Sequence, residues 1–219
     1  MILSIADILS PAEVGNAVAV LGRARFAQGR ETAGWAARTV KSNAQARDSE
    51  EIETLRDIIG ERLKAHAIFE MAARPKRLIG PMFSRYKSGD AYGEHVDEPI
   101  MDGVRTDLSF TLFLSAPETY DGGELIIASP AGEDAVKLPA GSAVVYPSTT
   151  LHRVAPITRG ERLAAVGWVR SLIRDAAQRE LLFELDTARR QIFEREGSSA
   201  TFNLVSKSLA NLIRMWSED

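Results

Sequence analysis

Two of the three histidines in this chain stand in a pattern that could hold a metal ion. His95 and Asp97 form a His-x-Asp pair, and His152 follows 55 positions after Asp97. Two neutral imidazoles and one carboxylate that leave coordination positions open suit a non-haem Fe(II) centre that uses oxygen. Arg162, ten positions after His152, could hold a carboxylate beside that centre through two parallel hydrogen bonds. The same three ligands also suit a hydrolytic zinc site, so the residues alone leave both metals open.

Strand geometry predicts how these side chains are brought together. Residues two positions apart in a strand face the same side, so His95 and Asp97 should project together. We also expect a tight connection through residues 158–160 to fold the segments around His152 and Arg162 into a hairpin. That pairing would make these two side chains near neighbours on one face.

The central part of the chain has the alternating pattern of β-strands. Large apolar and smaller or polar residues alternate over 108–115 and again over 161–170. Turn signals separate further short strands, expected at 123–128, 135–138 and 142–146. Many short strands with frequent turns favour a sandwich or a jelly roll. Three aromatic residues could line a pocket inside it or pack in its core: Tyr92, Tyr146 and Trp168.

The segment before the strands is predicted to be mainly helical. Ser10 and Glu13 form a capping box at the start of the first helix, with proline at the first helical position. A second helix is expected to begin after Asp48 or Ser49 and to end before Pro75. His66 lies in its last turns, where a lone histidine is expected to be a surface or capping residue.

Two further segments allow two interpretations each. Residues 31–47, rich in Ala, Thr, Gly and Asn, are either a solvated loop or a lid over the site. Helical stripes over 174–196 and from about 205 to Trp216, separated at Gly197, either pack on the β-structure or form a dimer contact.

Composition limits the classes of function. The chain has 219 residues, 45% of them apolar, which is enough for one substantial core. A net charge of −3 gives no electrostatic footprint for nucleic acid or an anionic membrane, so neither partner is expected. The absence of cysteine excludes disulfides and thiolate chemistry and fits a cytoplasmic location. We expect neither a signal peptide nor a membrane span.

Several motifs resemble the core of the iron/2-oxoglutarate dioxygenases of the prolyl-4-hydroxylase type. They are the stretch 83–97 with Tyr86 and the His-x-Asp pair, the run 105–115, Asp121-Gly-Gly-Glu-Leu125, the run 138–148, and the segment from His152 to Arg162. The whole chain, including its ends, closely resembles the bacterial PKHD-type hydroxylases. The motifs that carry the resemblance span roughly residues 83–171.

The resemblance implies roles for individual residues. His95, Asp97 and His152 would bind Fe(II), and Arg162 would bind the distal carboxylate of 2-oxoglutarate, with Arg105 the next candidate. Tyr86 stands where relatives often place a tyrosine that contacts this cosubstrate. Phe113 lies near a position where many animal relatives have a tyrosine that supports the cosubstrate. The corresponding hydrogen bond would be absent here or supplied elsewhere.

The resemblance also implies a fold and an activity. The fold would be α+β with a mainly β core, a double-stranded β-helix (jelly roll, cupin-like) flanked by helices. Its parts would be an N-terminal helical flank at 1–75, the dioxygenase domain at 76–171 and a C-terminal helical extension at 172–219. The activity would be hydroxylation with O2, as 2-oxoglutarate is converted to succinate and L-ascorbate serves as reductant. The prime substrate is left open between peptidyl proline, a free amino acid and another small molecule. The alternative is a non-catalytic cupin-like module that senses a metal or keto acid.

Overall fold

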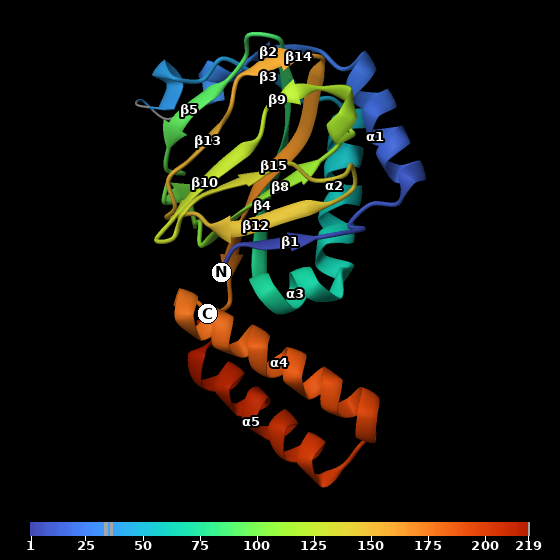
Figure 1. Ribbon diagram of the computed structural model, residues 1–219, viewed down its shortest axis with the longest axis vertical. Coiled ribbons are helices and arrows are strands. Elements are labelled where there is room, and N and C mark those ends of the chain that lie inside the picture. The colour runs from blue at the N-terminus through green and yellow to red at the C-terminus, as the bar shows by residue number, and fades with distance from the viewer. Residues whose placement is uncertain (33–34, 36, 219) are drawn as a thin grey trace.

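Two facing β-sheets form the centre of the protein (Figure 1). The structure is a computed structural model that describes the whole chain except residues 33, 34, 36 and 219. The major sheet has seven strands in the order β1-β12-β8-β15-β4-β3-β2, and the minor sheet has four in the order β11-β10-β13-β5. The predicted α+β architecture with a mainly β core is confirmed.

The strands of the major sheet are β1 (Leu3–Ile5), β12 (Ala143–Pro147), β8 (Leu108–Phe113), β15 (Glu161–Ser171), β4 (Pro75–Lys87), β3 (Ala44–Ala46) and β2 (Phe26–Gln28). Those of the minor sheet are β11 (Gly132–Val136), β10 (Leu125–Ser129), β13 (His152–Val154) and β5 (Tyr92–His95). Two small hairpin-like pairs complete the β-structure, β14 (Ile157–Arg159) with β9 (Asp121–Gly122) and β6 (Ile100–Met101) with β7 (Val104–Arg105).

The alternation predicted for β8 and β15 determines which side of the major sheet each residue occupies. Leu108, Phe110 and Leu112 of β8 join the large apolar core on the outer face, together with Leu163 and Ala165 of β15. The intervening residues of both strands face the minor sheet and line the space between the sheets, among them Thr111, Arg162, Val166 and Trp168. Because side chains alternate along these strands, one face of the major sheet packs in the apolar core and the other lines the space between the sheets.

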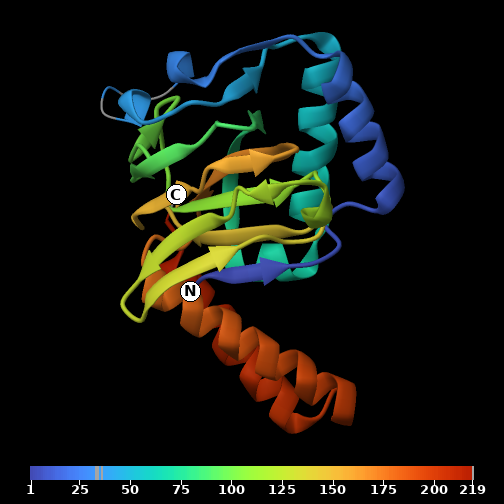
Figure 2. The ribbon, with the colours of Figure 1, turned by 45° about the horizontal axis from the view of Figure 1, so that its top comes forward.

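Three N-terminal helices cover the outer face of the major sheet (Figure 2). They are α1 (Pro11–Arg23), α2 (Glu50–Ala65) and α3 (Ala67–Ala73). The capping box predicted for α1 is present, because the Glu13 amide donates to Ser10 Oγ at 3.4 Å and the Ser10 amide donates to the Glu13 carboxylate at 2.8 Å. The helical segment begins after Ser49 and ends before Pro75 as expected, but it is not one continuous helix, since it breaks at His66, whose backbone is extended. The break turns α3 along the sheet, where Phe69 packs edge-on against Phe110.

The prediction of a mainly helical N-terminal segment is also incomplete. It contributes β1, β2 and β3 to the major sheet, each of only three residues and therefore too short to show an alternating pattern. Two short 3-10 helices, η1 (Gly29–Thr32) and η2 (Ala37–Thr39), connect β2 towards β3, with a further 3-10 turn, η3 (Pro117–Thr119), after β8.

The C-terminal helices form a hairpin that extends away from the sheets (Figures 1 and 2). They are α4 (Ala176–Glu196) and α5 (Ala200–Trp216), separated at Gly197 as predicted. A buried ion pair between Arg74 and Asp186, 3.1 Å apart, connects α4 to the start of β4. Among the helices in the described part of the chain, none is both long and apolar enough to cross a membrane.

Candidate active site

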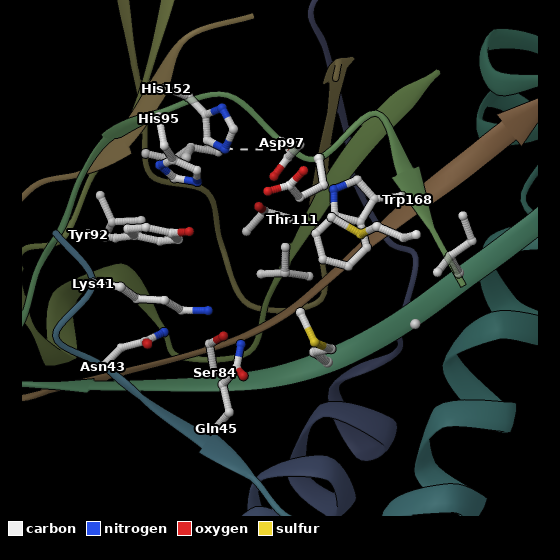
Figure 3. Close-up of a pocket in the computed structure, with 18 of the residues that line it drawn as sticks. Lys41, Asn43, Gln45, Ser84, Tyr92, His95, Asp97, Thr111, His152 and Trp168 are labelled. Atoms are coloured by element: carbon white, nitrogen blue, oxygen red, sulfur yellow. Dashed lines mark ion pairs between the residues drawn. The ribbon is translucent and has the colours of Figure 1, made fainter. Parts of the chain in front are cut away.

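The three predicted metal ligands converge at one end of the minor sheet (Figure 3). His95 is the last residue of β5 and lies opposite His152, the first residue of β13. Asp97 follows two positions after β5, outside the strand, yet its carboxylate still turns towards the two imidazoles. One ligand atom from each residue lies within 4.8 Å of the others, and His152 Nε2 is 3.8 Å from Asp97 Oδ2. This spacing suits a single metal ion bound on one face.

Backbone carbonyls orient both imidazoles. His95 Nδ1 lies 2.9 Å from the Gly93 carbonyl oxygen, and His152 Nδ1 lies 3.0 Å from that of Thr150. A carbonyl oxygen only accepts, so each Nδ1 must carry the proton and donate it. The lone pair is then on Nε2, which is the usual arrangement of a metal-bound histidine whose other nitrogen is held by the protein.

Aromatic packing holds both rings in place, and burial keeps the His95 ring uncharged. The Tyr92 ring stacks on His95 with centroids 3.7 Å apart, and Tyr146 packs edge-on against His152 at 5.1 Å. Burial, together with the neighbouring His152, lowers the pKa of His95 to about 4. His95 is therefore uncharged at neutral pH, as a metal ligand must be.

A pair of buried serines holds the carboxylate ligand. The Ser109 hydroxyl donates to Asp97 Oδ2 at 2.5 Å, and Ser109 Oγ and Ser148 Oγ lie 2.9 Å apart. Ser109 belongs to β8 of the major sheet and is fully buried. Sequence reasoning missed both serines, although the alternation of β8 already placed Ser109 on the face opposite the main core.

Arg162 reaches the same cavity from the other sheet. The predicted hairpin between the segments of His152 and Arg162 is wrong, because β13 pairs with β10 and β5 whereas β15 pairs with β4 and β8. Between them, β14 pairs with β9, so the chain crosses from the minor to the major sheet. The two side chains line one cavity from facing sheets and are not strand neighbours.

The Arg162 guanidinium is buried without a carboxylate partner among the described residues. The side chain is 1% exposed, forms none of the ion pairs found in the described part of the chain, and its Nε has no hydrogen-bond partner there. Tyr86, opposite Arg162 in the strand register, and Phe113 flank it with ring centroids 5.3 and 5.2 Å from the guanidinium carbon. Burial raises the pKa of Tyr86 to about 12. A buried charge without compensation is costly, so this environment suits an anionic ligand.

The Asp121-Gly122-Gly123 turn gives Arg162 its space. A Cβ on Gly123 would lie 2.3 Å from Ile157 Cδ1 and 3.1 Å from Arg162 Cδ, and φ there is +69°. The same Cβ would lie 3.2 Å from Tyr120 Cε2, so the Tyr120 ring and Arg162 flank one small volume. The buried Tyr120 hydroxyl interacts with the Arg162 guanidinium and has no other hydrogen-bond partner among the described residues. Tyr120 is therefore a candidate for the hydroxyl that Phe113 cannot supply.

Arg105, the second candidate from the sequence, is already paired. Its Nε lies 2.7 Å from Asp107 Oδ1, and its Nη1 lies 3.0 Å from Glu218 Oε2 near the C-terminus. Two carboxylates therefore neutralise this guanidinium, which leaves Arg162 as the better match for an incoming anion.

One cavity of about 510 Å³ is lined by the three candidate metal ligands together with Arg162 and Tyr86. Tyr92, Tyr146 and Trp168 line it, while Tyr146 and Trp168 also pack in buried apolar clusters, so both interpretations left open by the sequence apply. A further wall comes from the segment 31–47, which the sequence left undecided between loop and lid. In its described part, Lys41, Asn43 and Gln45 line the cavity (Figure 3). Residues 33, 34 and 36 of that segment lie outside the described residues.

Comparison with known proteins agrees with this geometry. A family model described as the 2OG-Fe(II) oxygenase superfamily matches residues 81–170, and one described as the PKHD-type hydroxylase C-terminal domain matches residues 176–218. A Pseudomonas putida prolyl-4-hydroxylase superimposes with a TM-score of 0.54 at 25% identity, over 78% of this chain and 92% of that chain. A viral collagen prolyl hydroxylase, at 19% identity and a TM-score of 0.55, shares the fold over 78% of this chain and 96% of that chain.

These matches define the class of protein, a 2-oxoglutarate- and Fe(II)-dependent oxygenase built on a double-stranded β-helix. Full-length relatives identify the family within that class. A PKHD-type hydroxylase from Synechococcus sp. (strain JA-2-3B'a(2-13)) is 50% identical over 223 residues, and one from Maricaulis maris (strain MCS10) is 47% identical over 219 residues. Both alignments cover 100% of each chain. The chain belongs to the PKHD-type hydroxylases and is an enzyme of the hydroxylase class.

Proposed function

We propose that this chain hydroxylates a substrate with O2 while it decarboxylates 2-oxoglutarate to succinate. One observation carries the proposal. Three metal-ligand atoms within 4.8 Å of one another and a buried guanidinium without a described carboxylate partner line the same cavity from opposite sheets. A cosubstrate that chelates a metal at one end and ends in a carboxylate at the other matches both features.

Each group has a defined task in this reaction. His95, Asp97 and His152 would hold Fe(II), which when bound supplies the means of activating O2. Arg162 would bind the distal carboxylate of 2-oxoglutarate, and the Tyr86 ring beside it would restrict the orientation of that carboxylate. The reaction balances as substrate C–H, O2 and 2-oxoglutarate giving substrate C–OH, succinate and CO2.

Two other functions use part of the same site. A hydrolytic zinc enzyme would need the three ligands but has no use for a buried cation across the cavity. A cupin-like sensor of metal or keto acid would need the ligands and Arg162 without turnover. The cavity of about 510 Å³ favours the enzyme, because it offers room for a second molecule beside the cosubstrate.

The deciding experiment follows 2-oxoglutarate with and without oxygen. Fe(II) and 2-oxoglutarate under anaerobic conditions should give a metal-to-ligand charge-transfer band. Admission of O2 should bleach the band and release succinate and CO2, slowly even without the prime substrate. The His152→Ala variant should be silent in both steps. A band that persists in oxygen, with no succinate over hours, would replace the enzyme with the sensor.

The metal site has its own test. The chain should bind one iron per molecule, and His95→Ala, Asp97→Ala and His152→Ala should each largely abolish binding, because a three-ligand site loses most of its affinity with one ligand. Metal analysis after desalting measures this. Normal iron content in all three variants would refute the ligand assignment.

Finer features of the activity also belong to this proposal. L-Ascorbate would act as reductant, and its effect is measurable as the number of turnovers before inactivation. The cytoplasm is the proposed compartment. The proposed parts are an N-terminal flank at 1–75, which is only partly helical, a dioxygenase domain at 76–171 and a C-terminal helical extension at 172–219.

The C-terminal hairpin is proposed to join two copies of the chain. Leu204 and Met215 of α5 are 64% and 73% exposed and lie three turns apart on one side of the helix. Light scattering should find a dimer that Leu204→Glu and Met215→Glu dissociate, whereas Val18→Glu on α1 leaves it intact. A monomer at all concentrations would refute this contact.

A further inference from the structure

The wall of the cavity across from the metal ligands is polar and buried. Lys41, Asn43 and Gln45 occupy alternate positions that run into β3, so strand geometry turns their side chains to one face. They are only 4%, 6% and 6% exposed, and all three line the cavity. Ser84 of β4, opposite Gln45 in the register, extends the same wall. Neither the proposed iron site nor the proposed cosubstrate clamp uses these residues.

The positive charge on this wall lies close to the metal ligands. Lys41 Nζ is 5.1 Å from the centre of the Tyr92 ring, and that ring stacks on His95. In Figure 3 the Lys41 ammonium points into the cavity, below the side chains of His95 and Asp97. An anionic group bound at Lys41 would therefore hold the rest of its molecule next to the metal.

The Asn43 side chain sets a second requirement for the ligand, which concerns hydrogen bonds. Its amide oxygen and amide nitrogen are both buried, and no well-aligned hydrogen bond satisfies either among the described residues, although the Tyr86 hydroxyl lies beside the amide. Figure 3 shows the amide directed towards the cavity beside Lys41. A buried amide without well-aligned partners is costly, so its complement is a ligand group that both donates and accepts, such as another amide.

Part of the remaining lining is apolar, and the charged residues Arg56, Glu98 and Asp102 also border the cavity. Met82, Met101 and Trp168 line the side of the cavity formed by the major sheet and the β6–β7 pair. A ligand that satisfies both walls has a carboxylate and an amide on one side and an apolar group on the other. An N-acylated apolar amino acid has this combination, as does the C-terminal residue of a peptide.

We propose that Lys41 and Asn43 form the subsite for the prime substrate, and that this substrate is an N-acylated apolar amino-acid unit with a free α-carboxylate. Lys41 pairs with the carboxylate and Asn43 with the adjoining amide. This inference rests on the proposed function, because it assumes that the metal and Arg162 are occupied by iron and 2-oxoglutarate. It assigns the hydroxylation to a carbon of the unit that lies against the apolar wall.

The test compares two probes of nearly the same shape, of which one carries a carboxylate and the other a neutral carboxamide. N-acetyl-L-leucine and N-acetyl-L-leucinamide are titrated by calorimetry into the anaerobic protein with Fe(II) and saturating 2-oxoglutarate. The acid should bind at least about tenfold more tightly than the amide, since a hydrogen bond to a charged group is the stronger kind. Lys41→Met should remove that preference, while Lys207→Met, an exposed lysine of α5, should retain it. Asn43→Ala should weaken both probes about equally.

Several outcomes would overturn the subsite. They are an absence of binding by either probe, equal binding of acid and amide by the unaltered protein, and a preference that survives in Lys41→Met. A further one is a Lys41→Met variant whose affinity for 2-oxoglutarate itself falls, since Lys41 would then bind the cosubstrate. N-acetylated dipeptides with leucine in the last or in the first position distinguish the end of a peptide from a small metabolite as the source of this unit. Failure of the proposed function has a different sign: the charge-transfer band with Fe(II) and 2-oxoglutarate never forms in the unaltered protein.

Discussion

Replacement of Arg162 by leucine should separate cosubstrate binding from iron binding. The guanidinium is 1% exposed and has no described carboxylate partner, so the distal carboxylate of 2-oxoglutarate would be its counter-ion. Loss of a charge-assisted, bidentate contact at a desolvated site costs roughly 2–5 kcal/mol. At 1.4 kcal/mol for each factor of ten, the affinity for 2-oxoglutarate should fall about 30-fold to several thousand-fold. Arg162→Lys should lose less affinity for 2-oxoglutarate, because the positive charge remains and only the two parallel hydrogen bonds of the guanidinium are lost.

Arg162→Leu should weaken cosubstrate binding without lowering the stability of the cosubstrate-free protein. The protein without cosubstrate already buries an uncompensated charge, and apolar replacement of such a group is often neutral or stabilising. Arg162→Leu should therefore melt at the same temperature as the unaltered protein or higher when 2-oxoglutarate is absent. At 100 times its Kd, 2-oxoglutarate stabilises the unaltered protein by about 2.7 kcal/mol, and the variant should lose this gain. A merely structural arginine would instead lower the melting temperature under both conditions.

The assay is a titration of 2-oxoglutarate into the Fe(II)-loaded protein without oxygen, followed by the charge-transfer band. Iron content should stay normal, because the three ligands come from the minor sheet and the loop after β5. Arg77→Leu is the matched control, an exposed arginine on β4 of the same sheet. An unchanged Kd in Arg162→Leu would refute the reasoning. Arg105 would then be a poor substitute, since Asp107 and Glu218 already neutralise it, and Lys41 would be the next candidate.

Three further predictions test the support of the site. Ser109→Ala should lower the affinity for Fe(II) about 10- to 100-fold in a metal titration, because the Asp97 carboxylate loses its orienting hydrogen bond; an unchanged affinity would refute this role. Gly123→Ala should weaken 2-oxoglutarate and lower the melting temperature more than Gly103→Ala, whose φ of +71° matches but whose Cβ would meet no atom within 4 Å; equal effects would show that crowding of Arg162 is unimportant. The metal-free protein should lose stability as the pH falls from about 6.5 to about 4, because burial lowers the pKa of His95 to about 4 and the unfolded chain takes up the proton first. Thermal melts of His95→Gln should show a flatter pH dependence, and an identical slope would contradict it.

Local patterns in the sequence predicted the parts of the fold that depend on local physics. The capping box of Ser10 and Glu13 places the start of α1, because the helix end needs those hydrogen bonds wherever it lies. The alternation in β8 and β15 indicates which residues enter the main core, since a strand has two faces and only one packs on helices. The candidate metal ligands were predicted from the His-x-Asp pair and a second histidine in a chain with only three, and the structure brings these three side chains together.

Pairing between distant segments could not be predicted in the same way. An even spacing between His152 and Arg162 is compatible with adjacent strands and equally with strands in facing sheets, and the structure has the second arrangement. The polar wall was missed because β3 has three residues, and Lys41 and Asn43 precede it. Their alternate spacing with Gln45 was a usable signal, but it acquires meaning only once β3 pairs with β4 at the edge of the cavity.

The division of the site between two sheets has a consequence for how its parts depend on each other. The histidine ligands belong to the minor sheet and Arg162 to the major sheet, with Tyr146, Leu125 and Val154 packed between them. The distance from metal to cosubstrate clamp is thus set by inter-sheet packing, which is nearly incompressible. Ser109 is the exception, because it belongs to the major sheet and yet holds a ligand attached to the minor one. A change at Ser109 can therefore alter the iron site and its distance from Arg162 together, whereas a change at Arg162 leaves the ligands as they are.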